Sequence, residues 1–155
     1  MVIMVVTGLL SVMVWAAIGS ATASSQLNSA ANKLASDLRY AQSLAAGTAV
    51  WYGVSFEVDP TNQYTIYTTT GTVDTVIEDP AKFGSGFVVN TNTTFGVTLD
   101  ASIGGGKKVE FSPIGTPYTD KSASGISAEG VVTLSKGTAT KTVRITATTG
   151  RVYVQ

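Results

Sequence analysis

The side chains that most often perform catalysis or hold a transition metal are missing from this chain. Its 155 residues include no histidine and no cysteine. Without imidazole there is no Ser-His pair and no general base with a pKa near neutrality, and without thiolates an ordinary zinc site is excluded. The absence of cysteine also excludes disulfide bonds. Any chemistry would have to come from carboxylates, hydroxyls and lysines.

Carboxylates occur together in two places. Glu57 and Asp59 lie two residues apart in a segment with strand periodicity, which puts them on one side about 7 Å apart, a separation compatible with glycoside hydrolysis. Asp74, Glu78 and Asp79 form an acidic cluster whose hard oxygen atoms suit calcium, but calcium needs more ligands than these three provide. Nothing else in the sequence forms a site around either group. The sequence therefore predicts no enzymatic activity, no metal and no cofactor.

Positive charge is concentrated at the C-terminal end. Residues 1–100 contain three basic and seven acidic side chains, whereas every charged residue after Glu129 is basic. These cations are Lys136, Lys141, Arg144 and Arg151. They form a candidate DNA-binding patch, with Tyr153 to stack on a base, but four cations give only weak, salt-sensitive binding. Because the acidic and basic residues lie at opposite ends of the chain, we expect opposite ends of neighbouring molecules to attract. Because the net charge of the whole chain is zero, we do not expect nucleic acid as a partner.

The first 46 residues are predicted to form one continuous helix, and residues 1–19 of it are predominantly apolar and uncharged. Eighteen residues of helix span about 27 Å, which matches the hydrocarbon core of a bilayer. The side chains expected in a membrane, or against other apolar helices, are Val2, Ile3, Val5, Val6, Gly8, Leu9, Leu10, Val12, Met13, Val14 and Trp15. A secretory signal peptide ending at residues 21–23 is an alternative, although it would lack the usual basic segment at its start.

The second part of this helix, residues 26–46, is amphipathic. Apolar residues recur there at spacings of three and four, which is the period of one helix face. The face consists of Leu27, Ala31, Leu34, Leu38 and Ala41 or Ala45. We expect this narrow stripe to pack on the following domain, with Lys33 and Asp37 on the remaining surface. Gly47 is the expected C-cap, so that the helix ends near Ala46.

After Thr48 the period changes to that of strands. Val50, Tyr52, Val54, Phe56 and Val58 alternate with other residues, so this segment is predicted to be a strand with one buried face. Further strands are predicted at residues 63–69, 73–77, 87–90, 96–99, 107–111, 131–135, 140–146 and 151–154. Residues 47–155 are thus expected to form a β-rich head. The predicted fold class is α+β, a long N-terminal helix on one small antiparallel sheet or a pair, with Trp51 in the groove between helix and sheet.

Three segments resemble the type IV pilin superfamily: the apolar start with Gly8, residues 29–45 (SAANKLASDLRYAQSLA), and residues 149–152 (TGRV). The resemblance is greatest to H-type minor pseudopilins of type II secretion and FimT-type minor pilins, to which residues 109–115 (VEFSPIG) are also similar. It implies a subunit held in the inner membrane before assembly. Assembly-platform proteins would then move it into a periplasmic or extracellular filament, a homopolymer or a mixture with related pilins. The helices would form the filament core, and the β domains its exterior.

Two features differ from the resembled family. Its members normally carry a glutamate near the mature N-terminus, whereas the first acidic residue here is Asp37. The position of Gly8 implies that about six residues, including this glutamate, precede Met1; a subunit without the charge is the alternative. No proline follows the apolar stretch, so a helix distortion would depend on Gly8, Gly19 or the small polar residues beyond it. The sequence leaves open a major subunit or a low-copy minor one that primes assembly or binds DNA.

Overall fold

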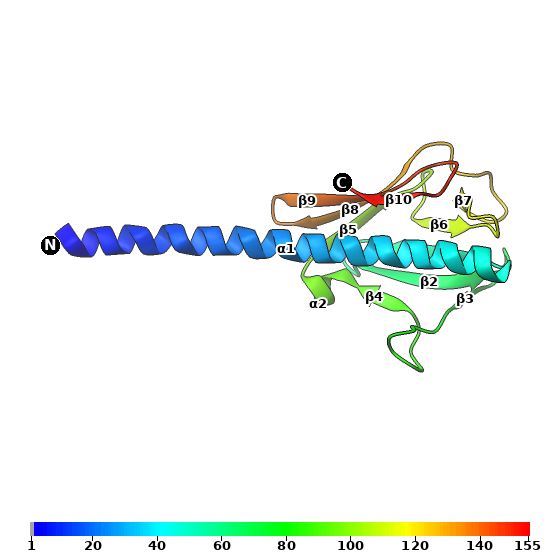
Figure 1. Ribbon diagram of the computed structural model, residues 1–155, viewed down its shortest axis with the longest axis horizontal. Helices are drawn as coiled ribbons and strands as arrows, with labels where there is room; N and C mark the ends of the chain where they lie inside the picture. Colours follow the sequence, from blue (N-terminus) through cyan, green and yellow to red (C-terminus); the bar gives the residue numbers. More distant parts are fainter. Residues whose placement is uncertain (1) are drawn as a thin grey trace.

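The computed structural model describes the backbone from Val2 to Gln155 and the side chains of residues 22–155. In Figure 1 a long helix, α1, extends at its N-terminal half away from a β-rich domain and lies along that domain at its C-terminal half. The helix runs from Val2 to Thr48, which corresponds to about 70 Å of rod. The predicted α+β fold class is confirmed.

The predicted membrane segment, residues 1–18, which includes Trp15, lies outside the part of the chain whose side chains are described. Over residues 22–155, whose side chains the structure describes, no helix combines the length and apolarity needed to span a membrane.

The C-terminal end of α1 differs from the prediction. Gly47 lies inside the helix, and the residue with left-handed backbone is Ala49, at φ 56°. The hydroxyl of Thr48 donates to the carbonyl of Leu44 at 2.7 Å. This bond satisfies one of the carbonyls that a helix end leaves free, so the helix continues through Gly47 without the glycine cap that the sequence indicated.

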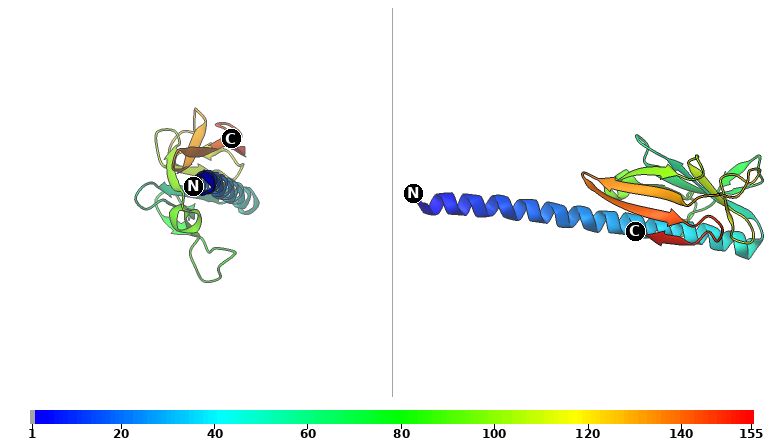
Figure 2. Two further views of the ribbon diagram at one scale, coloured as in Figure 1. Left: turned by 90° about the vertical axis from the view of Figure 1, so that its left-hand side faces the viewer. Right: turned by 90° about the horizontal axis from the view of Figure 1, so that it is seen from above.

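Two antiparallel sheets lie against α1 (Figure 2). The larger sheet has the strand order β3 (Asp74–Val76), β2 (Gln63–Thr69), β1 (Trp51–Glu57), β6 (Lys108–Phe111) and β7 (Pro117–Tyr118), and β4 (Val88–Asn90) also pairs with β2. The smaller sheet has the order β10 (Val152–Val154), β9 (Ala139–Ile145), β8 (Gly130–Lys136) and β5 (Thr98–Ser102). Strands of both sheets contact α1. Of the two predicted arrangements, the pair of sheets is therefore the one present.

One short helix that was not predicted, α2 (Thr91–Phe95), lies between the strands predicted at residues 87–90 and 96–99. Its N-cap is Asn90, whose side-chain oxygen accepts a hydrogen bond from the amide of Thr93 at 2.8 Å. Its C-cap is Gly96, with φ 65°. Because Gly96 closes a helix, β5 starts at Thr98 and not at residue 96. Alternation alone does not reveal this capped turn, since capping depends on a single polar side chain.

Trp51 does not lie between helix and sheet. In β1 the side chains of Tyr52 and Phe56 face the core that includes α1, and strand alternation places Trp51 on the opposite face. There its ring packs edge-on against Tyr118, with 5.0 Å between centroids, and Lys121 Nζ lies 5.8 Å from the ring centre. The prediction was wrong because two aromatic residues are adjacent at the start of this strand, and only one of them can face the helix.

Candidate functional site

The buried face of α1 contains the residues that the helical period singled out. The structure places Leu27, Ala31, Leu34, Leu38 and Ala41 at no more than 2% exposure. Ala45, the alternative to Ala41 in the prediction, is buried as well, and Ala30 and Ala35 are buried beside the stripe, so the face is wider than predicted. The width has a physical cause, because α1 contacts β1 and β6 of one sheet and β8, β9 and β10 of the other. This half of the helix is therefore part of the core of the β domain.

One charged residue lies within this interface. Asp37 is buried, and its carboxylate accepts hydrogen bonds from the hydroxyl of Tyr64 and from Lys33 Nζ, both at 2.6 Å. Burial, followed by the nearby charge of Asp37, raises the pKa of Tyr64 well above its usual range. The sequence interpretation, which placed Asp37 outside the buried stripe, is wrong here. A tyrosine hydroxyl from β2 supplies the partner that lets a carboxylate sit at this face.

A second buried carboxylate lies on the other face of the larger sheet. Glu110 accepts hydrogen bonds from the hydroxyl of Tyr67 at 2.8 Å, from Lys108 Nζ at 3.0 Å and from the amide of Lys121 at 2.5 Å. Lys108 also pairs with Asp120 at 2.5 Å. These contacts hold the chain after β7 over the sheet. Burial and the hydrogen bond to Glu110 raise the pKa of Tyr67 far above its ordinary value.

The two buried tyrosines predict a loss of stability in base. In the unfolded chain a phenol ionises at about pH 10, whereas Tyr64 and Tyr67 keep their protons to higher pH in the folded protein. Above about pH 10 the unfolded state therefore binds fewer protons, and the free energy of unfolding falls by about 1.4 kcal/mol per pH unit for each tyrosine. Their contribution is complete below that pH. Urea unfolding at a series of alkaline pH values measures the slope.

Single substitutions show which tyrosines cause this dependence of the free energy of unfolding on pH. Tyr64→Phe and Tyr67→Phe should each remove about half of the tyrosine contribution, because each deletes one titrating phenol. Tyr40→Phe is the matched control, since Tyr40 is exposed on α1. Equal slopes in the original chain and in both buried-site variants would contradict the expectation.

Gln42 joins α1 to two loops that are distant in the sequence. Its Nε2 donates to the carbonyl of Gly115 at 2.9 Å and to that of Thr149 at 3.2 Å. Gly150 has φ 65°, and a Cβ at that position would lie 2.6 Å from Gln42 Nε2 and 2.7 Å from the oxygen of Gly115. The helix segment, the loop after β6 and the C-terminal TGRV segment that carry the pilin resemblance thus meet at one point.

The basic residues of the C-terminal part do not form one patch. Lys136 and Lys141 lie at the hairpin between β8 and β9. Arg151 lies opposite Thr146, just beyond the other end of β9. Thr146 is five residues from Lys141, or about 17 Å along a strand. Arg144 pairs with Glu129 at 2.5 Å, and the hydroxyl of Tyr153 donates to the same carboxylate. The ring expected to stack on a base is therefore held at Glu129.

The carboxylate pair considered for glycoside chemistry does not share a strand. Glu57 is the last residue of β1, and Asp59 lies in the turn that follows it. Both are exposed, and Asp59 accepts a hydrogen bond from Asn62 Nδ2 at 3.1 Å. The prediction of one continuous strand through both residues was wrong because Pro60 follows Asp59 and the chain turns there.

Two carboxylates of the acidic cluster, Glu78 and Asp79, accept hydrogen bonds from backbone amides of their own loop. Asp79 accepts a hydrogen bond from the amide of Ala81 at 2.8 Å, and Glu78 accepts one from the amide of Gly84 at 2.5 Å. Asp74 is an exposed residue of β3. In the described residues, no group of three or more acidic side chains lies close enough together to hold a metal ion.

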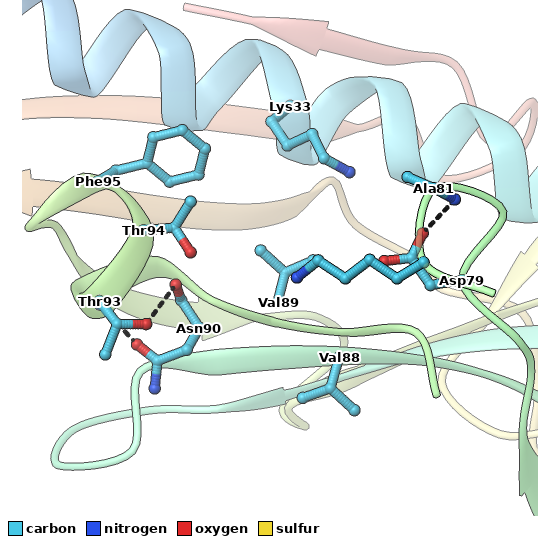
Figure 3. A pocket seen from close by; sticks show the side chains of 10 residues that line it. Lys33, Asp79, Ala81, Val88, Val89, Asn90, Thr93, Thr94 and Phe95 are labelled. Atoms are coloured by element: carbon cyan, nitrogen blue, oxygen red, sulfur yellow. Dashed lines mark hydrogen bonds between the residues drawn. The ribbon is translucent and has the colours of Figure 1, made fainter. Parts of the chain in front are cut away.

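A pocket of about 350 Å³ lies beside α1. Figure 3 shows Lys33 of α1 on one side, Thr94 and Phe95 of α2 on another, and Val89 of β4 facing them. The full lining is Lys33, Asp79, Ala81, Lys82, Val88, Val89, Asn90, Thr93, Thr94 and Phe95. Its walls are mainly apolar. The carboxylate of Asp79 and the side-chain oxygen of Asn90 accept hydrogen bonds from nearby backbone amides. No sequence motif indicated this pocket, since α1, α2, β4 and a loop each contribute to it.

Comparison with solved structures identifies the fold. The type IV minor pilin FimU of Pseudomonas aeruginosa is 16% identical, with 86% of this chain and 91% of FimU covered at a TM-score of 0.58. The minor pseudopilin EpsH from the type 2 secretion system of Vibrio cholerae is 14% identical, with 84% and 96% covered at a TM-score of 0.58. No family model and no curated protein sequence matches the chain. The chain has a type IV pilin-like fold, which confirms the resemblance.

Proposed function

We propose that this chain is a structural subunit of a type IV pilus-like filament or of a type II secretion pseudopilus. The observation that carries the proposal is the shape of α1, whose C-terminal half belongs to the β domain while its N-terminal half extends beyond it (Figure 2). An apolar helix leaves lipid at low cost only when other helices bury it again. Helices of further subunits supply that surface, so Val2 to Trp15 become the filament core and the β domain its exterior.

The proposed partners and location follow from this role. Before assembly the apolar segment lies in the inner membrane, and assembly-platform proteins transfer the subunit to the filament. The filament is periplasmic or extracellular and contains copies of this chain or related pilins. Nucleic acid is not among the proposed partners, because Arg144 is paired with Glu129 and the remaining cations are spread along the sheet. The role is structural and needs no catalytic group.

A low-copy minor subunit that primes assembly is the second candidate. FimU is described as a minor pilin and EpsH as a minor pseudopilin, and this favours the minor role. The two candidates differ in stoichiometry. Filaments sheared from cells should show this chain as the main band in mass spectrometry if it is the major subunit, and only as a trace if it is minor.

Assembly should depend on the apolar start of the chain. Val5→Asp introduces a charge into the apolar segment, where an aspartate costs up to about 3 kcal/mol in a membrane helix and has no partner in an apolar bundle. We expect electron microscopy and sedimentation of the full chain to show loss of filaments or of incorporation into them. Val73→Asp is the control, because Val73 is exposed on the β domain. Normal incorporation of the Val5→Asp chain would contradict the proposed core role.

A further inference from the structure

The loop between β3 and β4 carries an aromatic ring that the fold does not bury. Phe83 is 98% exposed. The loop around it is held in shape by the bridge between Glu78 and Gly86 and by a hydrogen bond from the amide of Asp79 to the carbonyl of Ser85 at 2.8 Å. In the view along α1 in Figure 2, this loop extends sideways from the axis of the helix. Phe83 is thus presented away from its own domain on a defined support.

The pocket beside α1 provides a matching cavity at the base of the same loop. Its volume is about 350 Å³, whereas a cavity of about 150 Å³ already holds benzene. Val88, Val89 and Phe95 supply apolar walls (Figure 3). The ammonium of Lys33, also at this pocket, is paired with Asp37 and lies 5.1 Å from the centre of the chain's own Phe87 ring. The chain's own Phe83 does not fill the pocket, since its ring is almost fully exposed.

We propose that Phe83 of one copy inserts into this pocket of a neighbouring copy. The inference rests on the proposed filament function and names one lateral contact of that filament. Between parallel copies in one filament, insertion of Phe83 into the pocket of the next copy is a heterologous contact, which builds an open helical assembly when the rotation between copies does not close a ring. In a bundle of parallel rods the neighbours lie to the side, which is the direction in which the loop extends. An aromatic anchor in such a pocket supplies a large share of the contact energy.

Cysteine cross-linking tests this contact in the full chain, because the chain has no cysteine of its own. Ser85→Cys marks the loop and leaves Phe83 in place, and Thr94→Cys marks the pocket. The two variants are expressed together with different tags, and filaments are treated with a short bis-maleimide. We expect a product that contains both tags. Ser124→Cys, an exposed serine in the loop after β7, replaces Ser85→Cys in the control pair and should give little product.

Substitution of Phe83 gives the decisive comparison. Phe83→Ala in the Ser85→Cys chain should lower the yield of the mixed product about 10-fold or more, and Phe83→Tyr, which keeps the ring, should restore most of it. Filaments that form normally but give no mixed product, or an Ala variant with unchanged yield, would overturn the inference and leave the proposed function intact. So would a product mainly between two Ser85→Cys chains, or with a different protein. If the unsubstituted chain enters no filament, both proposals fail.

Discussion

Leu34→Asp and Leu38→Asp are each expected to unfold the β domain. Both leucines are fully buried between α1 and the two sheets. An aspartate there would remove an apolar side chain from the core and leave a carboxylate without a partner. Together these effects cost about 4 kcal/mol or more, a large part of the stability of a domain of this size. Circular dichroism during thermal unfolding and resistance to protease both measure the loss.

Ser36→Asp is the matched control for this prediction. Ser36 lies between the two leucines in the sequence but on the exposed side of α1, so the same carboxylate stays in water there. Its effect should be within about 0.5 kcal/mol of zero. Equal destabilisation by all three substitutions would show that a charge anywhere on this helix is harmful and would contradict the division of α1 into a buried and a free face.

The fold was predictable where local periodicity and burial agree. Strand β2 has the predicted bounds, β8 and β9 differ from theirs by one residue at each end, and the apolar positions of α1 recur at helical spacing. Helix α2 and β7 were missed because they are only five and two residues long, too short for a period to develop. Two predictions based on glycine were also wrong. Gly47 was expected to end a helix and lies inside it, whereas residue 96 was expected to start a strand and Gly96 ends a helix.

The polar contacts were not predictable from the sequence. Glu110 stands between Val109 and Phe111 in an alternating strand, where a polar residue is expected to face water. It is buried because the chain after β7 folds back and supplies the amide of Lys121. Asp37 is likewise buried only because Tyr64 of β2 reaches it. In each case the hydrogen-bond partner comes from a distant part of the chain. Hydrophobic periodicity reports only on neighbouring residues and therefore cannot reveal such a partner.

Gly150→Ala is expected to be the most damaging glycine substitution at the junction of α1 with the C-terminal segment. Gly150 combines left-handed backbone with a close approach, since a Cβ would lie 2.6 Å from Gln42 Nε2 and 2.7 Å from the oxygen of Gly115. The backbone conformation alone costs alanine about 1–2 kcal/mol, and the overlap with a backbone oxygen adds about 1–3 kcal/mol. The TGRV segment would move away from α1, where Arg39 now donates to the carbonyl of Val152 at 2.8 Å.

Gly137→Ala separates these two costs. Gly137 has φ 60°, similar to Gly150, but nothing lies within 4 Å of a Cβ built there. Chemical unfolding should therefore show a loss of about 1–2 kcal/mol for Gly137→Ala and clearly more for Gly150→Ala. Adding Gln42→Ala to Gly150→Ala should not restore stability, because the Gly115 oxygen remains in place and the two hydrogen bonds of Gln42 are lost. Equal losses at both glycines would mean that the TGRV segment is free to move and that α1 does not depend on this junction.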